Sequence, residues 1–370
     1  MTILSATRMP TKTMSQFHPL RVASLKNETR DAVVVTLEVP EDAREKFKFA
    51  PGQNLTVRAM VGGEEVRRSY SICSAPHEKA VRIAVKRVQD GVFSTWANKE
   101  LKAGHLIECM APAGSFGAAL EPGSARHHVA FAAGSGITPV ISILKSVLEN
   151  EPQSRFTLVY GNRASSSVIF KEELEDLKDR YMGRLRLVFV LSREHQDIEL
   201  FNGRIDREKS DQLLKHWIDA SDIDMAYICG PQSMMEGVSA SLLANGVAKE
   251  HIKTELFGVG VREARKVAAS AAVAEEECHV RVIQDGRQRE FTMLRNKKTV
   301  LESALEQGVE LPYSCKGGVC STCRCKMTEG EVDMDVNFAL EDYEVARGFI
   351  LTCQSYALTD KLVLDFDQES

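Results

Sequence analysis

Four cysteines near the C-terminus are spaced as ligands for an iron–sulfur cluster. Three lie in one loop, Cys315-Lys-Gly-Gly-Val-Cys320-Ser-Thr-Cys323, and Cys353 follows outside that loop. The C-x4-C-x2-C…C spacing lets one loop present three thiolates to two irons while the fourth comes from elsewhere. The glycines let the loop turn tightly and bring backbone N–H groups close to the sulfurs. The spacing therefore predicts a plant-type [2Fe-2S] cluster, which passes single electrons.

Three other roles for these cysteines are less well supported. The chain has nine cysteines, an odd number, and no visible secretory signal, which argues against a disulfide framework. A structural zinc site usually has two C-x2-C pairs, and this stretch has one. An inert buried thiol is the ordinary role of a lone cysteine, and these four are clustered. Cys325 falls on an expected strand just past a ligand and should point the other way, so we do not expect it to bind iron.

Such a cluster needs an electron donor, and the N-terminal part of the chain has residues suited to a flavin. Arg68, Tyr70, Ser71 and Ile72 stand together at the end of an expected strand. A flavin needs a cation for its pyrophosphate, a flat apolar or aromatic surface and a hydrogen bond near its reactive N5, and these residue types supply all three. Taken alone, R-x-Y-S fits an exposed strand edge equally well.

Two further elements follow in the same region. An expected helix opens at Gly91, where backbone N–H groups could bind a phosphate. A turn rich in small residues comes next, at 111–117. Three such elements in this order favour FAD. The cofactor-binding residues expected from the second stretch are Lys86, Val88, Gly91, Phe93 and Ser94.

A glycine turn between an expected strand and an expected helix indicates a nucleotide site. The turn reads Gly134-Ser-Gly136-Ile-Thr138-Pro139. Its glycines let the backbone approach a pyrophosphate, the helix N-terminus favours negative charge, and proline fits the first helical turn. Because the third small position of G-x-G-x-x-G is proline here, the signal depends on its strand–turn–helix context.

Two arginines predict which nicotinamide nucleotide binds. Asn162-Arg163 and Ser192-Arg193 each end an expected strand of one parallel sheet, and such sheets bind ligands at the carboxyl ends of their strands. Arginines there could hold a 2′-phosphate bidentately, which predicts NADPH over NADH. For each arginine separately, a solvated loop position fits as well.

A third strand end carries Cys229-Gly230-Pro231. The Gly-Pro pair turns the chain sharply and leaves Cys229 facing the space above the glycine turn, where a nicotinamide ring would approach a flavin. The alternative is a buried structural thiol. Phe257 joins the expected cofactor-binding residues, and Ser71 and Cys229 are the expected catalytic residues.

The elements that must position these residues change along the chain. Short β-branched runs separated by turns predict an antiparallel β-barrel for FAD. Strand–helix alternation then predicts an α/β domain with a parallel sheet, and the last part predicts an α+β, β-grasp-like ferredoxin domain. The expected division is a flexible leader at 1–15, an FAD domain at 16–123, a nicotinamide nucleotide domain at 124–257, a linker at 258–275 and the [2Fe-2S] domain at 276–370.

Charge separates the C-terminal part from the rest. Residues 275–370 hold 11 Lys and Arg against 19 Asp and Glu, whereas the whole chain holds 47 against 52. An acidic module suits docking between domains or onto a partner, and a solvated acidic surface fits equally well. The net charge of −5 gives no support for nucleic acid or an anionic membrane, and no apolar run approaches the roughly 18 residues that span a bilayer. We expect a cytoplasmic protein that is monomeric when isolated.

Together these motifs resemble the ferredoxin–NADP reductase superfamily, whose members carry R-x-Y-S for FAD, G-x-G-x-x-P for the nicotinamide nucleotide and C-G-P near the hydride path. The domain order is similar to that of oxygenase reductases with a C-terminal [2Fe-2S] domain. The resemblance implies electron flow from NADPH through FAD and the cluster to an oxygenase component. It also implies FAD binding by Arg68, Tyr70 and Ser71, and NADPH binding by residues 134–138.

Finer stretches are similar to the reductase subunits of bacterial phenylacetyl-CoA epoxidases. They cover residues 64–73, 158–163, 202–206 and 311–320. This resemblance implies aerobic phenylacetate degradation, with diiron epoxidase subunits as the electron acceptor. Asp90 departs from the pattern, since relatives often have a second glycine there, and this leaves the phosphate contact beside Gly91 open.

Two rival functions fit the same motifs. The chain could serve another oxygenase, such as a Rieske ring hydroxylase, because cofactor motifs do not identify the partner. It could also be a non-catalytic electron carrier or redox sensor. Purified protein that lacks flavin, or that cannot reduce a dye with NADPH, would favour this last function.

Overall fold

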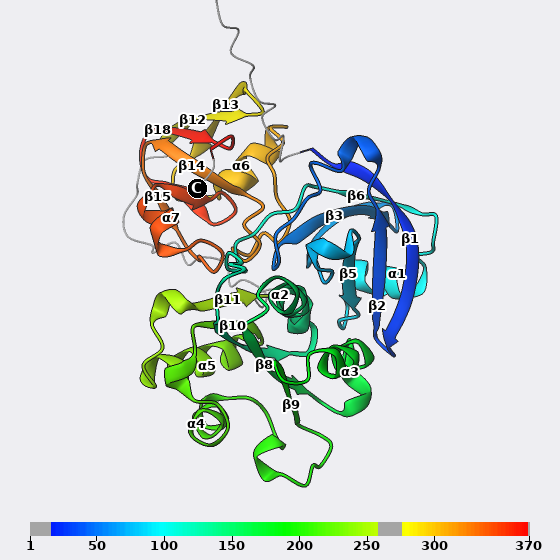
Figure 1. The fold of residues 1–370 in the computed structure, drawn as a ribbon. Helices are drawn as coiled ribbons and strands as arrows, with labels where there is room; N and C mark the ends of the chain where they lie inside the picture. Colours follow the sequence, from blue (N-terminus) through cyan, green and yellow to red (C-terminus); the bar gives the residue numbers. More distant parts are fainter. Residues whose placement is uncertain (1–15, 258–275, 369–370) are drawn as a thin grey trace, which may run out of the picture. The chain divides into compact units, whose positions relative to one another are not determined.

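The described residues form two compact units, one up to residue 257 and a second over residues 276–368. A computed structural model describes residues 16–257 and 276–368 (Figure 1). The expected leader at 1–15 and the expected linker at 258–275 lie outside the described residues.

The first unit begins with a six-stranded antiparallel sheet. Its order is β4-β3-β6-β1-β2-β5, and Ile72 just after β4 bridges Ile83 of β5, so the two edges meet and close a barrel. Helix α1 (Val92–Lys99) follows β5. The strands are β1 (His18–Thr29), β2 (Ala32–Glu38), β3 (Asn54–Val61), β4 (Glu64–Ser71), β5 (Val81–Lys86) and β6 (Leu106–Cys109).

Strand β2 shows why part of the barrel sequence is a continuous apolar run. Val33 and Val35 point into the barrel core. Ala32 and Val34, which alternate with them, belong to the core shared with the following domain. Both faces of the strand are therefore buried, and an alternating apolar–polar pattern is replaced by Ala-Val-Val-Val.

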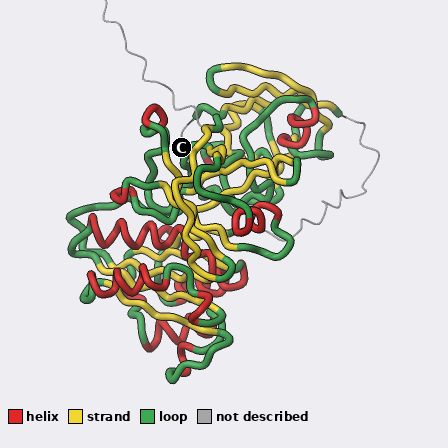
Figure 2. Tube along the Cα trace, turned by 90° about the vertical axis from the view of Figure 1, so that its right-hand side faces the viewer, coloured by secondary structure: helices red, strands yellow, loops and turns green. Residues whose placement is uncertain are grey.

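A five-stranded parallel sheet of order β11-β10-β7-β8-β9 follows in the same unit. Its helices lie against both faces of the sheet (Figure 1, Figure 2), so the expected α/β architecture is confirmed. The strands are β7 (His127–Ala133), β8 (Arg155–Asn162), β9 (Leu185–Leu191), β10 (Met225–Gly230) and β11 (Ile252–Leu256). The helices are α2 (Ile137–Asn150), α3 (Lys171–Arg180), α4 (Arg207–His216) and α5 (Gln232–Ala244).

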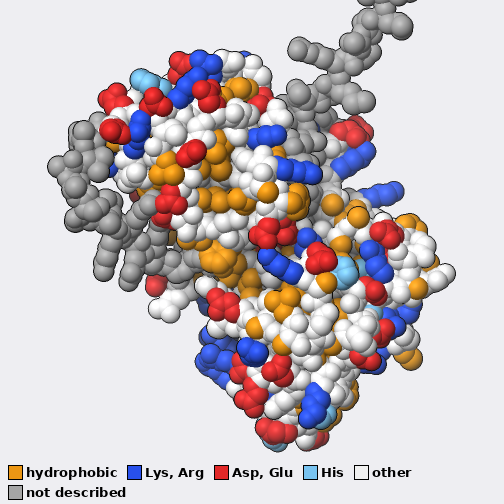
Figure 3. Space-filling model, turned by 90° about the vertical axis from the view of Figure 1, so that its left-hand side faces the viewer, with side chains coloured by type: hydrophobic (Ala, Val, Ile, Leu, Met, Phe, Trp, Pro, Cys, Tyr) orange, Lys and Arg blue, Asp and Glu red, His pale blue; other side chains and the backbone are white. Residues whose placement is uncertain are grey.

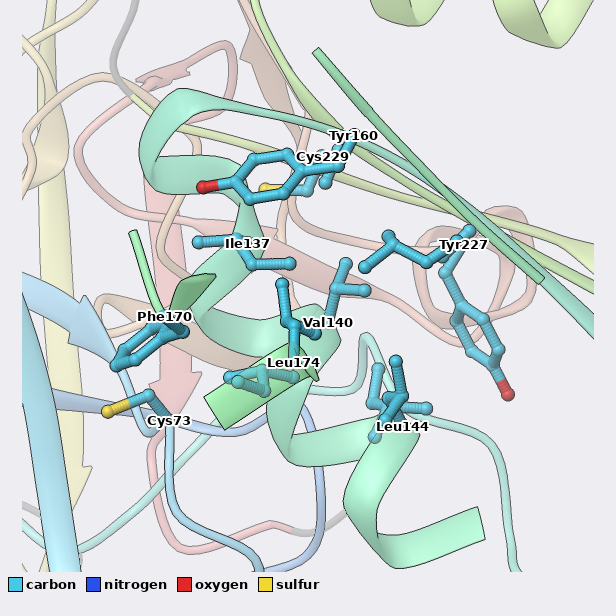
Figure 4. Close-up of a cluster of buried hydrophobic side chains, with 14 of the residues drawn as sticks. Cys73, Ile137, Val140, Leu144, Tyr160, Phe170, Leu174, Tyr227 and Cys229 are labelled. Atoms are coloured by element: carbon cyan, nitrogen blue, oxygen red, sulfur yellow. The ribbon is translucent and has the colours of Figure 1, made fainter. Parts of the chain in front are cut away.

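The barrel and the parallel-sheet domain share one hydrophobic core. Cys73 of the barrel belongs to the same buried cluster as Phe170 and Leu174 of the second domain (Figure 4). Polar contacts cross the same boundary, since the Ser142 hydroxyl donates to the Ser74 carbonyl oxygen at 2.7 Å. The two domains are thus packed as one body, and residues that meet across the boundary have a defined geometry.

An ion cluster reinforces this boundary. The Nζ atom of Lys145, on α2, lies 2.8 Å from a carboxylate oxygen of Glu78 in the barrel and 2.7 Å from one of Glu173 on α3. The Lys145 side chain is 6% exposed. A buried cation needs paired partners of this kind, because an unpaired charge is costly to remove from water.

The second unit is a small α+β fold. Its main sheet has the order β13-β12-β18-β14-β16, in which β12 and β18 are parallel and the other pairs antiparallel, and β15 pairs with β17. The expected Asp285-Gly286 hairpin is present, with both residues at positive φ. The elements are β12 (Glu277–Gln284), β13 (Arg287–Leu294), α6 (Val300–Glu306), β14 (Arg324–Glu329), β15 (Val332–Met334), α7 (Asp342–Ala346), β16 (Phe349–Leu351), β17 (Ser355–Ala357) and β18 (Lys361–Asp365). The expected fold class is confirmed for all three domains.

The helices of the described residues are short. The longest of them, α2, has 14 residues. Within the described ranges, none is long and apolar enough to cross a membrane.

Candidate functional site

The end of β4 presents a cation, an aromatic ring and a hydroxyl in sequence. Arg68 is exposed, and its Nη1 donates to the Arg67 carbonyl oxygen at 2.7 Å. The ring of Tyr70 packs against Phe93, with ring centroids 5.5 Å apart, and burial raises the pKa of the Tyr70 phenol. Ser71 is buried. The strand thus offers the three groups that a flavin needs, and their contact with FAD remains a prediction.

The loop after β5 is shaped around Gly91. A Cβ atom on Gly91 would overlap the Ser94 hydroxyl and the Val88 side chain. The Ser94 Oγ accepts from the Val88 N–H at 3.2 Å and donates to the Gly91 carbonyl oxygen at 3.3 Å. Gly91 is the N-cap of α1, so the first N–H groups of that helix open beside this compact loop.

The backbone conformation at Asp90 explains how aspartate can stand where the glycine-rich pattern has glycine. Its φ is +57°, in the left-handed region that favours glycine and that aspartate tolerates better than most residues. The loop therefore keeps the backbone conformation that a glycine would give. The substitution adds a negative charge at an exposed position beside the proposed phosphate site.

The glycine turn of the nicotinamide domain packs directly against the end of β10. A Cβ atom on Gly136 would overlap the Cys229 carbonyl oxygen, so glycine is required there. Gly134 has a φ of +54°, and its carbonyl oxygen accepts from the Tyr160 hydroxyl at 2.8 Å. The Nζ atom of Lys86, from the barrel, lies 3.6 Å from where a Gly134 Cβ would be. The structure thus brings an expected flavin-site residue to the nicotinamide turn.

The remaining members of the expected nicotinamide set support this turn. The Thr138 hydroxyl donates to the Ser135 carbonyl oxygen at 3.0 Å, and Pro139 is buried in the first turn of α2. On the facing strand end, a Cβ on Gly230 would displace the end of the Met234 side chain, and Pro231 is the N-cap of α5.

A residue that the motifs did not single out completes the junction of the two domains. Glu255, on β11, lies opposite Cys229 in the strand register. The Ser71 hydroxyl donates to Glu255 Oε2 at 3.0 Å, across the domain boundary. Burial raises the pKa of Glu255 to about 7, against the opposing effect of the Ser71 hydrogen bond. The one sequence feature that could have identified Glu255 is an acidic residue near the end of the last strand of a parallel sheet.

Cys229 is a neutral thiol in this setting. It is fully buried, and burial raises the pKa of its thiol well above the usual value, with the nearby Glu255 charge acting in the same direction. A thiol with a raised pKa is a poor nucleophile. Cys229 lies opposite Glu255 in the strand register, and its role on a hydride path stays a prediction.

The carboxyl ends of β8 and β9 hold the expected nucleotide arginines side by side. The Arg193 N–H donates to the Arg163 carbonyl oxygen at 2.8 Å, and both side chains are exposed. Asn162 is buried. Burial raises the pKa of the Tyr160 phenol, and hydrogen bonding from the Asn162 side chain acts against that larger effect. Ser192 is half-buried and Phe257 is 41% exposed. The donor set fits a nicotinamide nucleotide.

The cysteine loop of the second unit brings the four expected thiols together. Cys320, Cys323 and Cys353 are buried, and Cys315 is partly exposed. Hydrogen bonding from Cys320, and then from Cys353, lowers the pKa of Cys315, whereas hydrogen bonding with Cys315 raises the pKa of Cys353. Such mutual effects require the four sulfurs to be neighbours.

The interactions among the four thiols fit a shared metal cluster. Within residues 16–257 and 276–368, no group of three or more His, Cys, Asp or Glu side chains converges closely enough to hold a single ion. Hydrogen-bond interactions link Cys315 with Cys320 and Cys353, and Cys323 with Cys353. A [2Fe-2S] cluster spreads four sulfurs over two irons, so the residues present fit that group.

The loop also supplies hydrogen bonds to sulfur. The Gly317 N–H donates to Cys315 Sγ at 3.3 Å, and Gln354 Nε2 donates to Cys353 Sγ at 3.4 Å. Gly318 has a φ of +74°, and a Cβ there would come within 2.9 Å of the Val336 carbonyl oxygen. Such bonds stabilise thiolates and tune a cluster's potential.

Cys325 is separate from this set. It lies on β14 and is packed in the hydrophobic core of the second unit. Burial raises the pKa of its thiol well above the usual value. These surroundings fit a structural thiol, as expected from the sequence.

Three family models match the chain in the order of its domains. The oxidoreductase FAD-binding domain matches residues 19–117 and the oxidoreductase NAD-binding domain matches residues 131–240. The 2Fe-2S iron-sulfur cluster binding domain matches residues 282–358.

Two curated relatives span nearly the whole chain. The chain is 43% identical to a component protein of the 1,2-phenylacetyl-CoA epoxidase of Escherichia coli strain K12, over 96% of this chain and 99% of that protein. It is 35% identical to the ferredoxin reductase component of 3-ketosteroid-9-alpha-monooxygenase of Rhodococcus rhodochrous, over 94% of this chain and 96% of that protein.

Solved structures show the same modular fold. Phthalate dioxygenase reductase is 25% identical with a TM-score of 0.58, covering 96% of this chain and all of that one. An intact type IV self-sufficient cytochrome P450 monooxygenase is 24% identical with a TM-score of 0.68. The chain spans 41% of the length of that monooxygenase, and this likeness bears on the fold alone.

Proposed function

This chain belongs to the family of oxygenase reductase components that join FAD-, NAD- and [2Fe-2S]-binding domains, and we propose that it is the NADPH-dependent reductase of a phenylacetyl-CoA epoxidase. It is a flavin- and iron–sulfur-dependent oxidoreductase that carries electrons from a nicotinamide nucleotide to an oxygenase. The finer proposal takes NADPH as the donor and a diiron component as the acceptor. The observation that carries it is the 43% identity over 99% of the epoxidase component from Escherichia coli.

The proposed hydride site is the contact between barrel and parallel-sheet domain. When bound, FAD accepts a two-electron hydride and releases electrons one at a time. Ser71 and Glu255 share one hydrogen across the boundary at 3.0 Å. Gly136 lets the glycine turn approach the Cys229 backbone, and the neutral thiol fills the space beside them. These residues position the nicotinamide and flavin rings and exclude water, and no general base is required.

The proposed nucleotide assignment rests on the ends of β8 and β9. Arg163 and Arg193 are exposed there, and within the described part of the chain neither guanidinium forms a hydrogen bond or ion pair. Planar guanidinium groups bind phosphate bidentately. The buried Asn162 amide lies at the same strand end and adds a polar group there. This arrangement supports NADPH over NADH.

The proposed docking face for the oxygenase lies on the ferredoxin unit. The Phe338 N–H donates to the Gly318 carbonyl oxygen at 3.0 Å, so the partly exposed Phe338 ring, at 40%, lies next to the cluster loop. Acidic, basic and apolar side chains are mixed on the face that Figure 3 shows. A unit with an excess of acidic residues and exposed apolar side chains favours a partner with a basic docking surface. The exposed apolar residues of this unit are Phe338, Tyr343, Val345 and Leu358.

Reconstitution tests the proposal. An anaerobic NADPH titration followed by absorbance and EPR should show reduction of one flavin and one [2Fe-2S] cluster per chain. Addition of a diiron epoxidase component, oxygen and phenylacetyl-CoA should then give the epoxide. A Rieske 3-ketosteroid hydroxylase component serves as the comparison. Full reduction of both cofactors with turnover of the Rieske partner and none of the diiron partner would contradict the assignment.

A further inference from the structure

Glu194 occupies hydrogen-bond donors at the proposed 2′-phosphate end of the nucleotide site. It follows Arg193 just past the carboxyl end of β9. Its Oε2 accepts from the backbone N–H of Ser165 at 2.8 Å and from the Ser165 hydroxyl at 2.9 Å. Ser165 begins the short 3-10 helix Ser165–Ser167, which follows Arg163 at the end of β8. A carboxylate therefore ties together the two strand ends that carry the nucleotide arginines.

The same donors would suit a phosphate. A backbone N–H beside a serine hydroxyl is a common way to bind a phosphate oxygen. A carboxylate that already takes both donors competes with a 2′-phosphate and repels its charge. A ribose 2′-hydroxyl, by contrast, can donate a hydrogen bond to a carboxylate, as in dinucleotide sites selective for NADH.

We propose that Glu194 is a specificity-determining residue that restrains the preference for NADPH and preserves the use of NADH. The carboxylate accepts from the 2′-hydroxyl of NADH, and it must release Ser165 before the 2′-phosphate of NADPH binds between Arg163 and Arg193. The inference rests on the proposed nucleotide site. It adds to that site a carboxylate that acts against the preference of the two arginines for a 2′-phosphate.

The test is Glu194→Gln in the full-length holoenzyme. Glutamine keeps the size of the side chain and removes its charge. Affinity for 2′,5′-ADP, measured by isothermal titration calorimetry, should rise roughly tenfold, because a competing charge-assisted bond is lost. Affinity for 5′-AMP should fall or stay unchanged. The ratio of kcat/KM for NADPH over NADH, with ferricyanide as acceptor, should rise by a similar factor.

Two further variants serve as the matched control and the independent check. Glu199→Gln removes the same charge from an exposed position further along the same loop. It should change the ratio of the affinities for 2′,5′-ADP and 5′-AMP less than twofold. Ser165→Ala should weaken 2′,5′-ADP and leave 5′-AMP unaffected, because it removes a donor used by the phosphate alone. Equal effects of Ser165→Ala on both ligands would count against the proposal.

Arg193→Ala separates failure of this inference from failure of the site itself. If Arg193→Ala weakens 2′,5′-ADP and 5′-AMP equally, the proposed nucleotide site is wrong, and the inference falls with it. If Arg193→Ala weakens 2′,5′-ADP more than 5′-AMP, the nucleotide site stands. If Glu194→Gln then has no larger effect on the two affinities than Glu199→Gln, Glu194 has no part in specificity.

Discussion

Replacing Glu255 with glutamine should abolish a pH dependence of hydride transfer centred near pH 7. The Ser71 hydroxyl has one hydrogen, and in this structure it goes to Glu255 Oε2 at 3.0 Å. While Glu255 is ionised, that hydrogen is committed to the carboxylate. Protonation of Glu255 lets the carboxyl donate to Ser71 instead, which frees the serine hydrogen for the flavin side. Reduction of FAD should therefore be faster with Glu255 protonated.

The sign and size of the effect follow from the structure. Burial raises the pKa of Glu255 from 4.5 to about 7, so the carboxyl group ionises within the pH range of the assay. The rate should be high below this pKa and should fall as pH rises through it. A neutral hydrogen bond contributes about 0.5–1.5 kcal/mol, which corresponds to roughly a two- to thirteenfold change in rate. Glutamine donates an N–H to Ser71 at every pH, so Glu255→Gln should hold the fast rate throughout.

The assay is anaerobic stopped-flow reduction of the bound flavin by saturating NADPH between pH 5.5 and 8.5. Glu250→Gln is the matched control, because it removes an exposed carboxylate just before β11, and it should keep the wild-type profile. Ser71→Ala should be slow and insensitive to this titration. A Glu255→Gln enzyme that keeps the wild-type pH profile, or that is slow at both ends of the range, would refute the reasoning.

The remaining predictions concern the cluster, the glycine turn and the domain boundary. Cys353→Ser should abolish or strongly weaken the visible and EPR signals of the cluster with flavin content unchanged, whereas Cys325→Ser should retain them; the reverse result would reassign the fourth ligand. Gly136→Ala should destabilise the protein by about 1–3 kcal/mol and weaken NADP⁺ binding, because its methyl group overlaps the Cys229 carbonyl oxygen; calorimetric unfolding and titration measure both effects. Lys145→Met should lower the unfolding free energy by about 1–2 kcal/mol in urea titrations, because Glu78 and Glu173 lose their buried partner and keep only Arg82; a change below roughly 0.5 kcal/mol would show that Lys145 adds no stability.

Local chemistry made the cluster and much of the fold predictable. The ligands Cys315, Cys320 and Cys323 lie in one loop, so their spacing alone limits what they can bind. The Asp285-Gly286 turn fixes the register of its hairpin because the two residues reach positive φ at low cost. In both cases the residues that determine the structure are neighbours in the sequence.

The Ser71–Glu255 pair could not be predicted in the same way. The two residues are separated by 184 positions, and they meet because β11 lies next to β10 at one edge of the sheet while the barrel packs against that domain. The order of strands depends on packing of the whole unit, and a single sequence carries little information about it. Glu255 also has no motif of its own, so its importance follows from its burial and its partner.

The environment of Cys229 narrows what this residue can do in the reaction. Burial and the neighbouring Glu255 both keep its thiol protonated, so it neither attacks a substrate nor exchanges a proton at neutral pH. Its carbonyl oxygen, by contrast, is the atom against which Gly136 packs. The backbone at Cys229 therefore fixes the distance between β10 and the glycine turn, and the thiol contributes its size and its lack of charge. On the proposed hydride path, a small neutral side chain at this point would exclude water without competing with Ser71 for the proton shared with Glu255.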